Sequence, residues 1–194
     1  MMEAAASPTH HASETRLKAT TCIKNLSNAD ANDSALLNSP KLIEALGHVI
    51  LVSLRDNYLN NNHHNSMSDE QERETSRRRL NLTVTNACLA LMNLSIAKAN
   101  KRRVFRTPGV MEALMAVITK GDGEARVKSC SALSNLAIGY DNKIPMFHYP
   151  GFVEAILHVI ETDQGEARTK ACSIIWSFAA EMRNQVPVRI NKGI

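Results

Sequence analysis

The sequence predicts an all-α fold built from repeated helical units that stack into a solenoid. Three observations support this prediction: one stretch recurs at a fixed spacing, its apolar residues recur at helical intervals, and aromatic residues make up only 4 % of the chain. One helical repeat cannot bury its apolar face alone, so neighbouring units must pack against each other. With 194 residues, 44 % of them apolar, the chain is long enough for a short array.

The longest helix of each unit carries the clearest repeat. The stretch GEARVKSCSALSNLA at residues 123–137 returns 42 residues later as GEARTKACSIIWSFA at 165–179. Related segments lie 42 residues earlier, at 82–95, and at 14–27. Within 123–137 the apolar and small residues share one face of a 3.6-residue helix, which predicts burial of Ala125, Ser129, Cys130, Leu133, Leu136 and Ala137. We expect Leu91 and Leu94, the counterparts of Leu133 and Leu136, to be buried with them.

Two further signals recur in register and complete the unit. An asparagine precedes each short mixed segment, where we expect it to cap the start of a short helix: Asn32, Asn100, Asn142 and Asn184. A proline then opens each apolar stretch and predicts the start of a second helix: Pro40, Pro108 and Pro150. One unit is therefore a short helix, a second helix, a turn rich in Gly and Asp, and a longer third helix.

The first interval is longer than the others. From Leu26 to Leu94 the spacing is 68 residues instead of 42, which leaves 26 extra residues. Residues 57–79 are polar without apolar periodicity, so we expect a solvated loop there, between first helices at 14–56 and further repeats at 80–194. Residues 1–13 are expected to be a disordered tail. The last repeat stops at 184–194, where its second helix should begin, so we expect the chain to be part of a longer array.

Taken together, these signals resemble Armadillo repeats, the family of the catenins, plakophilins and importin-alpha. The resemblance rests on the three-helix unit, the 42-residue period, the Pro before the second helix and the A-x-x-A-L-x-N-L-A-like third helix, over residues 14–194. It implies a right-handed superhelix whose third helices line a concave groove for extended peptides. The groove tryptophans of importin-alpha-like repeats are absent here, so binding of nuclear signals is not expected. Trp176 stands as in plakophilin-like repeats, where we expect it to pack.

A polar face of the third helices is the candidate site. Lys128, Ser131 and Asn135 stand at i, i+3 and i+7, opposite the apolar face. Stacking would turn the corresponding residues into a row, in which amides hold the backbone of an extended peptide and lysines favour an acidic partner. The predicted partner-binding residues are Lys18, Thr21, Asn25, Asn86, Leu89, Asn93, Lys128, Ser131, Asn135, Lys170, Ser173 and Ser177. The alternative is a merely solvated helix face.

Other functions have weaker support. No catalytic or phosphate-loop motif occurs, so we expect neither an enzyme nor a cofactor. His63 and His64 lack neighbouring ligands at metal-site spacing and are read as loop residues. The basic runs at 77–79 and 101–103 can contact phosphates, which keeps RNA binding as the alternative function, although the net charge is only +4.

The remaining expectations concern location and the cysteines. No segment reaches the roughly 18 apolar residues of a membrane span, and the start lacks a secretory signal. We therefore expect a cytoplasmic or nuclear protein. The cysteines are expected to pack in the core as small apolar residues, not to form bridges or bind metal: Cys22, Cys88, Cys130 and Cys172.

Overall fold

The computed structural model describes residues 8–29, 32–62, 70–121 and 123–181. Over these ranges the chain contains α-helices and no β-strand, which confirms the all-α prediction. The helices are α1 (Pro8–Leu26), α2 (Asp33–Asn38), α3 (Pro40–Asn62), α4 (Glu70–Leu94), α5 (Lys98–Arg106), α6 (Val110–Lys120), α7 (Gly123–Ala137), α8 (Lys143–Phe147), α9 (Phe152–Thr162) and α10 (Gly165–Ala179).

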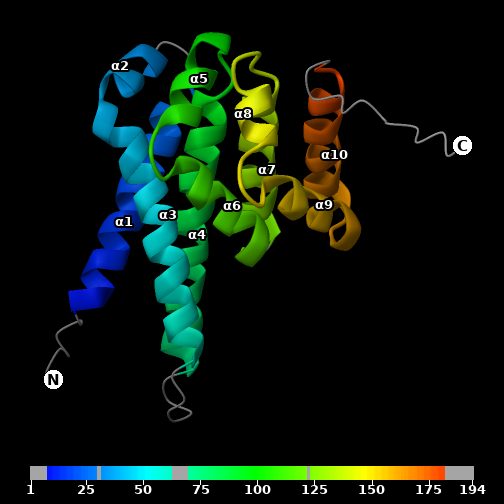
Figure 1. Ribbon diagram of the computed structural model, residues 1–194. Helices are drawn as coiled ribbons and strands as arrows, with labels where there is room; N and C mark the ends of the chain where they lie inside the picture. Colours follow the sequence, from blue (N-terminus) through cyan, green and yellow to red (C-terminus); the bar gives the residue numbers. More distant parts are fainter. Residues whose placement is uncertain (1–7, 30–31, 63–69, 122, 182–194) are drawn as a thin grey trace, which may run out of the picture.

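The helices follow the predicted order of short, second and third helix three times. The units are α2–α3–α4, α5–α6–α7 and α8–α9–α10, and α1 takes the place of a third helix before them. The third helices pack in sequence, α1 on α4, α4 on α7 and α7 on α10, and the second helices pack as a neighbouring row, α3 on α6 and α6 on α9. Figure 1 shows α1 and α10 at opposite ends of this stack, with the short helices along one edge.

The core lies between these two rows of helices. Leu91, Leu94, Leu133 and Leu136 are each 0 % exposed, as the repeat predicts. Second helices supply the opposite side, with Phe152 among the largest fully buried side chains. Because burying a side chain of this size contributes about 1.5–3 kcal/mol, the recurring leucines hold each unit to its neighbours.

The start of each second helix depends on the residue after the proline. Gly109 and Gly151 have φ angles of 78° and 71°, a left-handed conformation that favours glycine, and α6 and α9 begin directly after them. Lys41 holds the corresponding position in the first unit, where α3 begins at Pro40 itself. The predicted start at the proline is therefore correct for α3, and α6 and α9 start two residues later.

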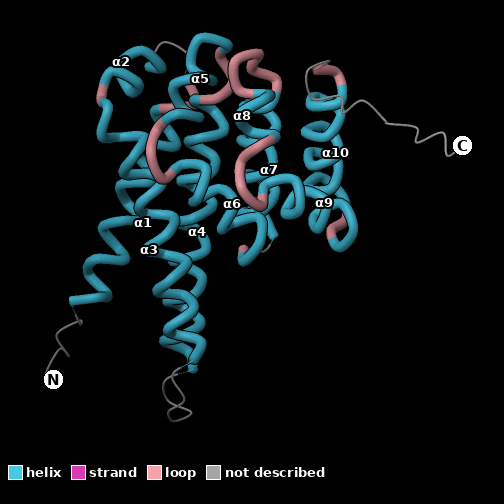
Figure 2. The backbone as a smooth tube through the Cα atoms, in the orientation of Figure 1, coloured by secondary structure: helices cyan, strands magenta, loops and turns pink. Residues whose placement is uncertain are grey.

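The prediction of a solvated loop at 57–79 is wrong where the structure describes these residues. α3 runs on to Asn62 and α4 already begins at Glu70, while 63–69, including the His63–His64 pair, lie outside the described residues. α3 has 23 residues against 11 in α6 and α9, and α4 has 25 against 15 in α7 and α10. Figure 2 shows both helices continuing past the ends of α6 and α9 as a protruding helical arm. At 1.5 Å per residue, the arm adds about 15–18 Å.

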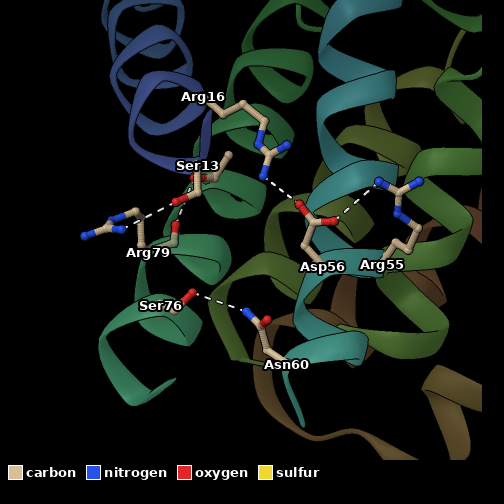
Figure 3. A network of polar contacts seen from close by, with 8 residues as sticks. Ser13, Arg16, Arg55, Asp56, Asn60, Ser76 and Arg79 are labelled. Atoms are coloured by element: carbon tan, nitrogen blue, oxygen red, sulfur yellow. Dashed lines mark hydrogen bonds and ion pairs between the residues drawn. The ribbon is translucent and has the colours of Figure 1, made fainter. Parts of the chain in front are cut away.

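Polar contacts hold the two helices of this arm together. Asn57 Nδ2 donates to Asn81 Oδ1 over 3.1 Å. Nearer the tip of the arm, Asn60 Nδ2 donates to Ser76 Oγ over 3.2 Å, and Figure 3 shows this second contact. Helices that meet through amides and hydroxyls need no apolar stripe. The absence of apolar periodicity was therefore a poor guide to secondary structure in this segment.

Charges also favour a helix at the beginning of α4. Glu70 and Glu72 lie in its first turn, where negative charge is favourable, and Arg78 pairs with Glu74 one turn earlier at 2.8 Å. Glutamate, glutamine and arginine are also good helix formers. This acidic-then-basic order at 70–79 was the available sequence signal for a helix.

The prediction of a disordered tail at 1–13 is likewise wrong for its described part, because α1 begins at Pro8. Arg79 Nη1 donates to Ser13 Oγ over 3.4 Å, and Arg16 Nη2 lies 2.7 Å from Asp56 Oδ2 (Figure 3). These contacts join α1 to the base of the arm. Residues 1–7 and the expected start of another unit at 184–194 lie outside the described residues.

Candidate functional site

The predicted polar row lies on the four third helices, which pack side by side. Its members differ widely in exposure. Lys18, Asn25 and Ser173 are exposed; Thr21, Leu89, Lys128, Asn135 and Lys170 are half-buried; Asn86, Asn93, Ser131 and Ser177 are buried. Only the exposed and half-buried members of the row are therefore accessible to a ligand.

Hydrogen bonds tie the buried members of α4 to α1. Asn93 Nδ2 donates to Ser27 Oγ over 3.2 Å and to Asn28 Oδ1 over 2.8 Å. About two turns earlier on α4, Asn86 Nδ2 donates to Thr21 Oγ1 over 3.0 Å. The amides of α4 thus serve the contact between two third helices.

The same arrangement recurs at the next two steps of the stack. Asn135 Nδ2 on α7 donates to the carbonyl of Met92 over 3.2 Å, and Ser177 Oγ on α10 donates to the carbonyl of Ala137 over 2.8 Å. At one repeat position, each third helix therefore donates a hydrogen bond to the C-terminal end of the preceding one. This polar position is visible in the sequence, but we expected its side chains to bond only to a partner peptide.

The lysines of the row are unequally available. Lys18 pairs with Glu14 at 2.8 Å and Lys128 with Glu124 at 3.7 Å, both one turn earlier on the same helix. Lys170 has no ion-pair partner among the described residues. The Lys18–Glu14 pair is exposed and contributes little to stability, so an acidic ligand can compete for the amine of Lys18.

An arginine at one repeat position of two third helices connects neighbouring units. Arg126 Nη1 on α7 lies 3.0 Å from Asp163 Oδ2, in the turn before α10, and its Nη2 donates to the carbonyl of Gly121 over 2.6 Å. Arg16, at the corresponding position of α1, makes the similar contact with Asp56 on α3. Both pairs are about three-quarters buried, so removing one partner would leave a poorly solvated charge between the units.

The recurring asparagines before the short helices act differently from the prediction. Neither Asn32 nor Asn142 makes a side-chain hydrogen bond at the start of the following helix. Asn32 Nδ2 donates back to the carbonyl of Leu26 over 3.0 Å, and Asn142 Nδ2 donates back to that of Leu136 over 3.1 Å. Asn100 lies inside α5. The expected N-cap position is therefore correct for Asn32 and Asn142 and wrong for Asn100. The amides of Asn32 and Asn142, however, cap the end of the preceding third helix instead of the start of the following one.

The cysteine prediction holds for two residues and fails for two. Cys88 and Cys130 are fully buried, and burial raises the pKa of both thiols, for Cys130 to about 12. Cys22 and Cys172 are exposed, and all four cysteines are free. Cys172 is exposed because α10 stands at the end of the described stack, where no further described helix covers its outer face.

Trp176 corrects a second expectation about the same face. Its side chain is 73 % exposed, so it does not pack in the core as predicted. The residue lies four positions, about one turn, after Cys172 on α10. The outer face of α10 thus presents a large aromatic side chain to solvent.

The described residues contain no cluster of three or more His, Cys, Asp or Glu side chains that could hold a metal ion. No helix in the described ranges combines the length and apolar character needed to cross a membrane. No protein-family model matches the sequence, and no curated protein is significantly similar to it. The class defined by fold and site is an all-α protein of packed three-helix units with a polar row along its third helices.

Proposed function

We propose that this protein is a non-enzymatic scaffold of the Armadillo type that binds an extended segment of a protein partner along the row on its third helices. The observation that carries the proposal is the sequential packing of α1, α4, α7 and α10, which places corresponding polar residues on neighbouring helices. The 42-residue period and the three-helix unit support the assignment to this type.

The accessible residues define how such a segment would be held. Asn25 and Ser173 are exposed and offer an amide and a hydroxyl group that can bond to a peptide backbone whatever its side chains. Lys18 and Lys170 stand near the two ends of the row and favour acidic side chains. Asn93 and Ser177 are buried and serve the stack, so the ligand would be held mainly by the other members of the row.

Peptides of about ten residues provide a direct test, because at 3.3 Å per residue they cross three helices spaced about 10 Å apart. Acidic, neutral and basic sets would be titrated against the full chain by fluorescence polarisation. Acidic peptides should bind best. Lys18→Glu and Lys170→Glu should each weaken them by about tenfold at low salt, less at high salt.

Lys120→Glu supplies the matched control, because Lys120 is exposed at the end of α6 and lies outside the row. It changes net charge by the same amount and should leave affinity nearly unchanged. Equal losses from all three reversals would reduce the proposal to non-specific attraction. RNA binding with a steep salt dependence, in the absence of peptide binding, would favour the nucleic-acid alternative instead.

A further inference from the structure

A cleft with an arginine-rich wall lies between α3 and α5, away from the row on the third helices. Arg102, Arg103 and Arg106 of α5 line it, Thr107 and Pro108 follow at the end of that helix, and Glu44 of α3 contributes from the other side. Its volume is about 570 Å³. A close packing contact lies nearby: a Cβ on Gly47 of α3 would stand 3.1 Å from the carbonyl oxygen of Gly109. The cleft therefore lies next to the place where the start of α6 packs closely on α3.

The guanidinium groups in this cleft are largely unused within the molecule. The side chains of Arg103 and Arg106 have no hydrogen bond or ion pair with any described residue. Arg102 lies 3.6 Å from Asp141, and both side chains are 56 % exposed, so this pair is weak. The lining of the cleft thus contains three guanidinium groups and a single carboxylate, that of Glu44. Glu44 has no ion-pair partner among the described residues.

The other units show that packing does not require these arginines. Val104 between them is 0 % exposed, and its counterpart Met146 in α8 is also 0 % exposed, so the buried position keeps an apolar residue. The counterparts of the three arginines include no arginine or lysine: Ser34, Ala35 and Asn38 in α2, and Ile144, Pro145 and His148 in α8. The arginines are therefore specific to one unit and point to a ligand of that unit.

The spacing of the arginines suits one compact anion. Residues three and four apart on a helix have Cβ atoms about 5–6 Å apart, which places Arg106 next to both Arg102 and Arg103. Guanidinium groups bind phosphate oxygens through paired, charge-assisted hydrogen bonds. We propose that this cleft binds the phosphate group of a phosphorylated peptide.

Two observations favour a peptide over a nucleic acid. The carboxylate of Glu44 would repel a chain of successive phosphates, whereas a peptide can place a lysine or arginine there. The second basic run includes the exposed Arg77 and Arg78 and lies on the arm, at the opposite end of α4 from α5 (Figure 1). From Arg78 to the last residue of α4, Leu94, the helix rises about 24 Å at 1.5 Å per residue. The two runs therefore do not form the continuous basic stripe of a nucleic-acid interface. The proposal adds that the peptide carries a basic residue next to its phosphorylated one.

A degenerate library of short peptides with a fixed central phosphoserine tests this site on the full chain. The phosphoserine peptides should bind at least about tenfold more tightly than the same peptides with an unmodified serine. Sequencing of the bound phosphoserine peptides should show lysine or arginine enriched at one flanking position. Arg103→Gln and Arg106→Gln should each reduce binding by about tenfold. Arg77→Gln, an exposed arginine on the arm, is the matched control and should change nothing. Glu44→Gln should remove the preference for a basic flanking residue while keeping the requirement for phosphate.

Several results would overturn the proposal. A third set of peptides would carry glutamate in place of the phosphoserine. Equal binding of the glutamate and phosphoserine peptides would show a general attraction for acidic groups, and a failure of both to bind would refute a phosphopeptide site in the cleft. Binding of an RNA oligonucleotide, or of vesicles containing a phosphoinositide, that depends on Arg103 and Arg106 while the peptides fail would assign the arginines to another ligand. Lys18→Glu and Lys170→Glu change the row on the third helices and not the cleft. Their effect on acidic-peptide binding therefore tests the proposed function alone, and the two sites are tested separately.

Discussion

Asn93 and Asn25 hold corresponding positions on α4 and α1, and the structure gives them opposite roles. Asn93 is 9 % exposed and its side chain donates two hydrogen bonds to the end of α1, whereas the side chain of Asn25 is exposed and has no partner among the described residues. The substitutions Asn93→Ala and Asn25→Ala remove the same atoms from the same repeat position. Any difference between them therefore measures the contact between helices.

The structure gives the size of this difference. Each hydrogen bond contributes about 0.5–1.5 kcal/mol net, so the loss of two lowers the free energy of unfolding by about 1–3 kcal/mol. No larger penalty is expected, because Ser27 keeps its own bond to the carbonyl of Lys24 at 2.8 Å and Asn28 is exposed to water. Asn25→Ala should stay within about 0.5 kcal/mol of the parent, as exposed sites usually do.

Thermal and urea unfolding followed by circular dichroism would measure both variants. For a chain of this size 1 kcal/mol corresponds to about 2–4 °C in Tm, so Asn93→Ala should melt several degrees lower and Asn25→Ala at the parent temperature. Equal shifts for the two variants would refute the reasoning. They would show that the buried amide contributes no more than the exposed one and that the row does not hold the stack together.

Further predictions test the core, the thiols and the arm. Leu136→Ala should lower the free energy of unfolding by about 2–5 kcal/mol, because the side chain is 0 % exposed; an unchanged melt would contradict the packing described. In the native protein a thiol reagent should label Cys22 and Cys172 quickly, and all four cysteines only after denaturation; four fast thiols would show an open core. Burial raises the pKa of Cys130 from the ordinary 9.0 to about 12, so between these pH values its thiol ionises only in the unfolded chain. The free energy of unfolding should therefore fall as pH rises above about 9, and it should fall less in Cys130→Ala. Replacing residues 57–79 by a short turn should leave the stack folded but lower the total helical signal; loss of the folded state would show that the arm is essential.

The sequence was sufficient to predict the repeating part of the fold. Its 42-residue period and the apolar face around Leu133 and Leu136 are consequences of packing identical units, so they are visible in the residues themselves. The arm was missed because its helices meet through Asn57, Asn81 and Asn60, and polar contacts leave no apolar period. Helix propensity and charge order decide the structure there, and these are weaker signals than periodicity.

The residues of the predicted row lie on the third helices, but their division into exposed and buried members was not predictable. Asn25, Asn93 and Asn135 are the same residue at the same repeat position, yet one is exposed, one is buried and one is half-buried. The difference arises from what the preceding helix offers at that level: a hydroxyl and an amide for Asn93, a carbonyl for Asn135. These neighbours lie 43 to 66 residues apart in the sequence and are brought together only by stacking, so the pattern of a single helix does not contain them.

The hydrogen bonds between third helices also have a direction along the chain. Asn93, Asn135 and Ser177 each donate from a later helix to an acceptor on the one before it. A growing polypeptide leaves the ribosome from its N-terminal end, so every newly made third helix meets acceptors that have already emerged. These hydrogen bonds can therefore form as soon as the later of the two third helices has been made.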